Sequence, residues 1–141
     1  MVTSSDESSQ FLPRFNESGL ITCVTMDSTT QDILMVAYMN EEALQETLRT
    51  GRAVYYSRSR KALWRKGEKS GNWQEVQEVR VDCDQDCLQL LVKQTGGAAC
   101  HTGRHSCFYR RIKSGQSTEL EFIDQNRLFD PTQVYGKSST E

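Results

Sequence analysis

Cysteines and carboxylates of metal-binding type gather within 26 residues of this chain. The run Asp82-Cys83-Asp84-Gln85-Asp86 comes first, followed by Cys100-His101 and then Cys107. Carboxylate oxygens suit Mg²⁺ or Mn²⁺, whereas thiolates suit Zn²⁺. Along an extended segment the three aspartates would share one face and Cys83 would point to the other. The pattern therefore predicts two metal sites of different chemistry, an arrangement typical of enzymes.

Three cysteines are candidates for a zinc site: Cys83, Cys100 and Cys107. Structural zinc modules usually contain close CxxC pairs, and this chain has none. Three ligands without such a pair favour an open, catalytic site. The alternative is that free cysteines serve as small buried hydrophobes. We assign Cys23 and Cys87 to that alternative because each lies in an apolar strand pattern.

Both histidines of the chain, His101 and His105, lie between Cys100 and Cys107. A zinc ion held by three thiolates acidifies bound water less than one held by three neutral imidazoles, so a nearby base would help. His101 is therefore the candidate catalytic base. A histidine beside a cysteine is more often structural or on the surface, and for His105 both readings stay open.

The three aspartates at alternate positions would repel one another unless a cation or solvent compensates their charge. A charged strand edge that blunts aggregation is the alternative. The position of Cys83 among them favours a magnesium site formed by Asp82, Asp84 and Asp86.

The segment from residue 57 to residue 71 carries six cations against one anion. Arginine forks and the backbone amides of Gly-Ser turns bind phosphate well, and Trp64 and Trp73 supply surface for stacking a nucleobase. The alternative is a solvated charged surface. We expect a phosphorylated nucleotide as substrate, contacted by Arg58, Arg60, Trp64, Arg65, Lys66 and Ser70.

The bulk composition fits one cytoplasmic domain. The chain has 141 residues, a net charge of −2 and an odd number of cysteines, five, which argues against a disulfide framework. The charge also argues against a nucleic-acid partner, and no stretch approaches the roughly 18 apolar residues of a membrane span. We expect a disordered tail over residues 1–10, a domain over 11–114 and a C-terminal extension over 115–141.

The elements that must position these residues are mainly strands. Apolar β-forming runs predict strands over 20–25, 33–39, 53–57, 76–81, 88–92 and 108–112, with a further apolar run over 120–123. A turn is expected over 27–32 and a polar loop over 58–72. One helix should begin after the N-cap Asn40 and stop at Gly51.

Five blocks of the sequence resemble the phosphoribosyl-AMP cyclohydrolase family of histidine biosynthesis, over about residues 15–112. They are LMVAYMNEEAL, YYSRSR, LWRKGEKSG, DCDQD and ACHTGRHSCFYRR. The resemblance implies an α+β, predominantly β fold in an intertwined homodimer with metal sites at the subunit interface. It also implies one Zn²⁺ per subunit, bound by Cys83 of one subunit with Cys100 and Cys107 of the other, and Mg²⁺ bound by Asp82, Asp84 and Asp86.

The reaction implied is opening of the purine ring of N1-(5-phosphoribosyl)-AMP between N1 and C6. Water activated by zinc would attack C6, with His101 as the proton acceptor. Two positions depart from the family pattern: Asn72 replaces a frequent histidine, and Cys87 adds a thiol, which leaves a fourth thiolate ligand open as the alternative to a small buried residue. About 29 residues follow Ile112, so we expect a monofunctional form. The competing hypothesis is a zinc-stabilised phosphate- or RNA-binding module without catalysis.

Overall fold

The computed structural model describes residues 7–115 and 118–135. The tail expected over residues 1–10 and the extension expected over 115–141 therefore lie partly outside the described residues. The elements are the strands β1 (Ile21–Asp27), β2 (Ile33–Met39), β3 (Val54–Ser57), β4 (Ala62–Arg65), β5 (Gln74–Val81), β6 (Cys87–Gln94), β7 (Arg110–Ile112) and β8 (Leu120–Phe122), and the helices α1 (Glu41–Thr50) and α2 (Pro131–Val134). This composition confirms the α+β, predominantly β class.

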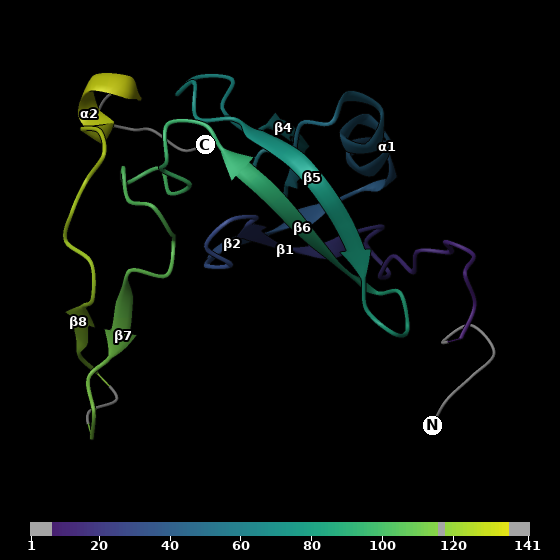
Figure 1. Ribbon diagram of the computed structural model, residues 1–141, viewed down its shortest axis with the longest axis horizontal. Coiled ribbons are helices and arrows are strands. Elements are labelled where there is room, and N and C mark those ends of the chain that lie inside the picture. The colour runs from purple at the N-terminus through teal and green to yellow at the C-terminus, as the bar shows by residue number, and fades with distance from the viewer. Residues whose placement is uncertain (1–6, 116–117, 136–141) are drawn as a thin grey trace.

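A four-stranded sheet with the order β2-β1-β6-β5 forms the centre of the molecule (Figure 1). β1 and β6 run parallel, and the other neighbouring pairs are antiparallel. β1 and β2 form the hairpin expected from the sequence. Its turn is fixed by the Asp27 carboxylate, which accepts hydrogen bonds from the backbone N–H groups of Thr29 and Thr30 at 2.8 and 2.9 Å.

Helix α1 follows β2 directly, as predicted. The Asn40 side chain accepts a hydrogen bond from the backbone N–H of Ala43 at 2.8 Å, which satisfies one of the free donors of the first turn. Gly51 ends the helix in the left-handed conformation at φ 75°, where glycine has no Cβ clash. Ala43 and Leu44 are buried, so the helix turns its apolar side to the core.

The hydrophobic core lies on one face of the central sheet. Side chains at alternate positions of β1, β2 and β6 point to this face, and α1 and β3 pack close by. Cys23 is completely buried there, which confirms its assignment as a small core residue, and burial raises the pKa of its thiol. The core residues include Ile21, Leu34, Met35, Met39, Leu44, Val54, Leu88, Leu90 and Val92.

A chain of buried polar side chains runs through this core. The Tyr55 hydroxyl donates to Gln74 Oε1 at 2.6 Å and shares a hydrogen bond of 2.7 Å with Thr25 Oγ1. Gln74 Nε2 donates to Gln94 Oε1 at 2.9 Å, and Gln94 Nε2 donates to the Asn72 carbonyl at 2.7 Å. The network joins β1, β3, β5 and β6, and its end at Asn72 gives that buried residue a structural contact.

The expectation of a continuous polar loop over residues 58–72 is wrong in part, because β4 lies within it. β4 pairs with β3 in a hairpin, and the rings of Tyr55 and Trp64 lie opposite each other with centroids 5.4 Å apart. Cross-strand aromatic contact of this kind stabilises a short hairpin despite the flanking charges. The chain then turns at Gly67, where an added Cβ would lie 2.3 Å from the backbone nitrogen of Trp73.

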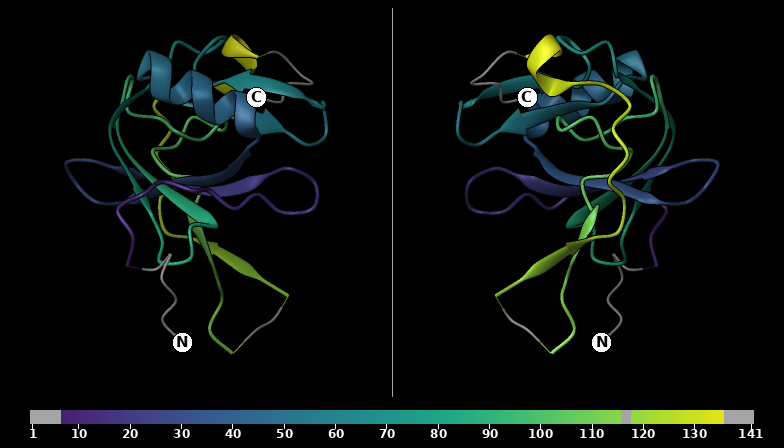
Figure 2. Two further views of the ribbon diagram at one scale, coloured as in Figure 1. Left: turned by 90° about the vertical axis from the view of Figure 1, so that its right-hand side faces the viewer. Right: turned by 90° about the vertical axis from the view of Figure 1, so that its left-hand side faces the viewer.

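The C-terminal hairpin of β7 and β8 stands away from the central sheet (Figures 1 and 2). β7 lies at the end of the strand predicted over 108–112, and β8 corresponds to the apolar run at 120–123. Several of its apolar side chains are exposed, among them Ile112, Leu120 and Phe122. None of the helices in the described part of the chain is long and apolar enough to cross a membrane.

Candidate functional site

The aspartate run forms the turn between β5 and β6. The Asp82 carboxylate accepts hydrogen bonds from the backbone N–H groups of Asp86 at 3.0 Å and Cys87 at 3.1 Å, and Gln85 has a positive φ of 61°. The expectation of an extended segment with alternating faces is wrong here. The chain reverses within these residues, so position along a strand does not decide where their side chains point.

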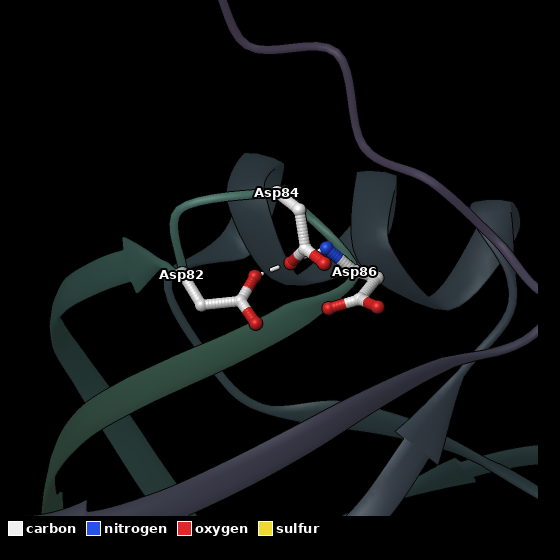
Figure 3. A group of neighbouring side chains, drawn as sticks. All are labelled: Asp82, Asp84 and Asp86. Carbon is white, nitrogen blue, oxygen red and sulfur yellow. Dashed lines mark hydrogen bonds between the residues drawn. The ribbon is translucent and has the colours of Figure 1, made fainter. Parts of the chain in front are cut away.

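The turn nevertheless brings the three aspartates together. One oxygen from each of Asp82, Asp84 and Asp86 lies within 4.8 Å of the others, and all three residues are exposed (Figure 3). Hydrogen bonds to Asp84 and then to Asp82 raise the pKa of Asp86 to about 6, whereas the hydrogen bond with Asp86 lowers the pKa of Asp84. Three carboxylates this close together repel one another when all are ionised, and a hard divalent cation would relieve the repulsion.

Cys100 and Cys107 form the second cluster. The backbone N–H of Cys107 donates to the Leu34 carbonyl of β2 at 2.7 Å, and the Thr102 hydroxyl donates to the Cys100 sulfur at 3.0 Å. The hydrogen bond from Cys107 is the main cause that lowers the pKa of Cys100 to about 5, and the hydrogen bond from Thr102 lowers it further. One thiol of the pair is therefore ready to act as a thiolate, the form that binds soft metals.

Cys83 does not join this pair within one chain. It lies in the β5–β6 turn, beyond the Cys87 end of β6 (Figure 1). The backbone of Cys107 is hydrogen-bonded to Leu34 of β2. Leu34 lies beside Thr25 and Met26 of β1, which pair with Leu90 and Leu91 of β6. The Cys87 end of β6 and the level of Leu90 and Leu91 are about 12 Å apart along the strand, and the distance from β2 across β1 to β6 adds about 10 Å sideways. Two thiolates on one zinc lie only about 4 Å apart, so these cysteines of one chain cannot share an ion.

The two histidines lie in different surroundings. His101 is exposed and directly follows Cys100 on the turn. His105 is partly buried, with Nδ1 2.8 Å from the Gly97 carbonyl oxygen and Nε2 3.5 Å from an Asp32 oxygen. These contacts tie His105 to two neighbouring loops, whereas His101 faces solvent beside the thiol pair.

The cationic segment separates into two groups. Arg58 and Arg60 are exposed at the tip of the β3–β4 hairpin, where Arg58 lies 4.2 Å over the Tyr38 ring and Arg60 Nε lies 3.5 Å from Ser57 Oγ. These two guanidinium groups remain on the surface, where an anionic ligand could reach them.

The other members of the segment are held by the protein. Arg65 makes a two-pronged ion pair with Glu46 of α1, at 2.6 and 2.8 Å. Lys66 is buried, and its Nζ donates to the Ala99 carbonyl at 2.6 Å and lies 5.5 Å over the Trp64 ring. The Ser70 hydroxyl accepts the backbone N–H of Asn72 at 3.1 Å.

Two residues lie beside the thiol pair although the sequence did not predict them there, and one of them, Lys66, was expected at the substrate instead. Lys66 reaches the residue before Cys100 and lies close enough to Cys107 to lower the pKa of that thiol, although hydrogen bonding to Cys100 and burial raise it overall. Thr102 donates to the Cys100 sulfur. The position of Thr102 two residues after Cys100 could have indicated its contact with the sulfur. The contact of Lys66 could not be predicted in this way, because it depends on how the β3–β4 hairpin folds.

Several known proteins are similar to this chain over most of its length. The model of a family described as "Phosphoribosyl-AMP cyclohydrolase" matches residues 35–109. A "Phosphoribosyl-AMP cyclohydrolase" of Nitrobacter hamburgensis is 59% identical and aligns over 97% of each chain. One from Bradyrhizobium sp. (strain ORS 278) is 60% identical over 90% of this chain and 98% of its own, and one from Rhodopseudomonas palustris (strain TIE-1) is 61% identical over 89% and 84%. Similarity over this length means that the chain is an enzyme belonging to the phosphoribosyl-AMP cyclohydrolase family.

Proposed function

We propose that this chain opens the purine ring of N1-(5-phosphoribosyl)-AMP by hydrolysis of the N1–C6 bond, giving the phosphoribosyl-formimino-AICAR phosphate intermediate of histidine biosynthesis. Family membership supports the reaction and argues against a binding module without catalysis. The structural observation that carries the proposal is the thiol pair of Cys100 and Cys107 with the exposed His101 beside it.

The donor chemistry of each cluster supports a separate metal ion. Cys100 and Cys107 would hold Zn²⁺, because their shared proton leaves one thiolate available and sulfur suits this ion. Asp82, Asp84 and Asp86 would hold Mg²⁺, because three converging carboxylates suit a hard cation. When bound, zinc supplies a Lewis acid that makes water a nucleophile at neutral pH.

We propose a homodimer because of the position of Cys83. If Cys83 is the third zinc ligand, it must come from a second copy of the chain, because strand β6 keeps it far from Cys107 of its own chain. A closed two-fold dimer would then contain two equivalent zinc sites, each using residues of both subunits. The exposure of Cys83 supports this role, since its side chain is accessible to another molecule.

The residues of this chain supply the proton transfers and the substrate contacts. The purine is cationic when N1 carries a ribosyl group, so C6 is electrophilic. Oxygen from water adds to C6, His101 accepts a proton from that water, and N1 takes up a proton as the N1–C6 bond breaks. One water is consumed, and C6 ends as the carbon of a carboxamide. Arg58 and Arg60 at the hairpin tip are the contacts proposed for a substrate phosphate.

Ultraviolet absorbance of purified protein mixed with phosphoribosyl-AMP tests the proposal. We expect a change in the absorption spectrum as the purine ring opens, and its loss in the Cys107→Ala variant together with bound zinc. The Cys23→Ala variant should keep both, because Cys23 is a fully buried core residue and is not one of the proposed ligands. No spectral change with the zinc-loaded wild-type protein would refute the reaction, and full zinc content in Cys107→Ala would refute the ligand assignment.

A further inference from the structure

The C-terminal segment after β8 folds back onto the turn that carries Cys100 and His101 (Figure 1). The backbone N–H of Leu128 donates to the Gly103 carbonyl at 2.6 Å. The Phe129 carbonyl approaches Gly103 so closely that an added Cβ there would lie 2.2 Å from its oxygen. Glycine is therefore required at this contact, both for the close approach and for its φ of +89°.

Arg104 makes the second contact between the turn and the C-terminal segment. Its side chain is 7% exposed, and its Nε donates to the Asp124 carbonyl at 3.3 Å. Its guanidinium carbon lies 4.1 Å from the centre of the Tyr109 ring and 5.2 Å from that of Phe122. No carboxylate in the described ranges forms an ion pair with Arg104. A buried cation without a carboxylate needs such stacking and carbonyl contacts, so they fix where Arg104 lies.

Gly103 and Arg104 are also the residues that hold the backbone of Cys100. The N–H of Cys100 donates to the Arg104 carbonyl at 3.1 Å, and the N–H of Gly103 donates to the Cys100 carbonyl at 2.9 Å. The C-terminal segment thus contacts the two residues that close the turn around Cys100. Outer contacts that orient a metal ligand in this way commonly affect metal affinity.

We propose that the segment from Asp124 to Phe129 positions Cys100 for metal binding, with Arg104 and Leu128 as the positioning residues. The inference rests on the proposed zinc site and adds to it a part of the chain that lies outside the family match at residues 35–109. Each end of the turn is then fixed: Cys107 is anchored to β2, and the Cys100 side of the turn is anchored to the C-terminal segment.

Hydrogen exchange on the metal-free protein tests the positioning by itself. Leu128→Pro removes the N–H that bonds to Gly103, because proline has no backbone donor. We expect faster exchange of the Cys100 and Gly103 amides, with unchanged exchange in β1. Leu128→Ala and Leu120→Ala form a milder matched pair, since both leucines are about half exposed, at 56% and 52%, and only Leu128 lies against the turn, beside Gly97. Unchanged exchange at Cys100 in Leu128→Pro would overturn the inference.

Titration with Co²⁺ tests the link to the metal, because thiolate-to-cobalt absorption reports the ligands without any turnover. We expect Leu128→Pro and Arg104→Lys to weaken Co²⁺ binding about tenfold or more, because residues that orient a metal ligand affect metal affinity to this extent. Leu120→Ala should bind Co²⁺ as the wild type does. If exchange in β1 also becomes faster in Leu128→Pro, that variant has lost its fold. The Co²⁺ affinities of Arg104→Lys and Leu128→Ala then test the inference in its place. Faster exchange with unchanged Co²⁺ affinity would overturn the role in metal binding. A wild-type protein whose cysteines bind no Co²⁺ would instead refute the proposed site, whatever the exchange shows.

Discussion

The aspartate triad is the place where single residues control the binding of a cation. Asp82, Asp84 and Asp86 are exposed, and the hydrogen bonds among them lower the pKa of Asp84 and raise the pKa of Asp86. The pKa of Asp86 is raised to about 6, mainly through Asp84 and next through Asp82. Above that pH Asp86 is ionised and adds its negative charge to the cluster. Below that pH a proton on Asp86 competes with a bound cation.

We therefore expect the Mg²⁺ affinity of the protein to fall as the pH is lowered from 7.5 to 5, most steeply near pH 6, because protonation of Asp86 removes a ligand. Calorimetric titration with Mg²⁺ across this range measures the change. In Asp84→Asn the affinity should be weaker at pH 7.5 and the transition should move to lower pH, since the main cause of the raised pKa is gone. An affinity that does not vary with pH would contradict the expected competition.

Two arginines of the cationic segment should behave differently on substitution. Arg60 is exposed at the hairpin tip, whereas Arg65 is engaged by Glu46. Arg60→Gln should raise KM for phosphoribosyl-AMP about tenfold or more, because a charged hydrogen bond to phosphate is worth roughly 1.5–3 kcal/mol. Arg65→Gln should leave KM nearly unchanged.

Steady-state kinetics of both variants at full zinc content separates these roles. A raised KM in Arg65→Gln alone would place the substrate phosphate in the hollow between α1 and β4 that Arg65 and Arg49 line. Equal KM values for both variants and the wild type would mean that the phosphates are held elsewhere.

At the scale of the elements, the buried polar chain from Thr25 to Asn72 determines how the β3–β4 hairpin sits on the central sheet. The Tyr55 hydroxyl links two strands of the sheet, since it forms hydrogen bonds with Thr25 of β1 and Gln74 of β5. Its burial keeps the hydroxyl protonated, because burial raises the pKa of Tyr55. Hydrogen bonds in such a dry environment specify a single packing arrangement.

Tyr55→Phe should lower the free energy of unfolding by about 1–3 kcal/mol, because the side-chain oxygen Oε1 of Gln74 and the Thr25 hydroxyl each lose a buried partner. Chemical denaturation measures this loss. Tyr56→Phe on the same strand is the matched control, since the Tyr56 hydroxyl bonds to none of the residues that the structure describes. Equal stability of the two variants would mean that water replaces the lost partner.

Elements governed by local interactions were predictable from the sequence, and those governed by distant contacts were not. Helix α1 follows from Asn40, its first-turn glutamates and Gly51, which all act within the helix itself. The β5–β6 turn is an exception, since its contacts are local and it was still missed: it contains neither glycine nor proline and forms because the Asp82 side chain accepts two backbone N–H groups. β4 was hidden among cations because its stabilising contact is with Tyr55 of the preceding strand.

The same distinction applies to the site. The types of Cys100, Cys107 and the aspartates indicated metals, and the fold brings each group together. The contact of Lys66 with Ala99 and that of Leu128 with Gly103 join residues far apart in the sequence, so spacing carries no signal for them.

At the scale of the whole molecule, the position of Cys83 means that a zinc site containing Cys83, Cys100 and Cys107 would need two chains. The parallel pairing of β1 and β6 puts the β5–β6 turn and the Cys107 anchor at different levels of the sheet. Chelation of zinc should therefore also weaken the dimer, because the proposed ion bridges the subunits.

A mixture of two inactive variants provides the sharpest test of a shared site. Cys83→Ala and Cys107→Ala should each be inactive alone, since every site in either homodimer lacks one ligand. In a mixed dimer one site receives Cys83 from the Cys107→Ala chain, with Cys100 and Cys107 from the Cys83→Ala chain, and is complete. Random reassociation gives half mixed dimers with one intact site of two, so about a quarter of the wild-type activity and zinc content should return.

Cys100→Ala mixed with Cys107→Ala is the matched control for this experiment, because both losses fall on the same half of the site and no mixed dimer contains a complete set. Turnover and zinc per subunit, measured after unfolding and refolding the variants together, distinguish the two arrangements. If the Cys83→Ala and Cys107→Ala mixture stays inactive although mixed dimers form, Cys83 and Cys107 do not meet across the subunits. The separation of these residues within one chain would then exclude Cys83 from the zinc site altogether.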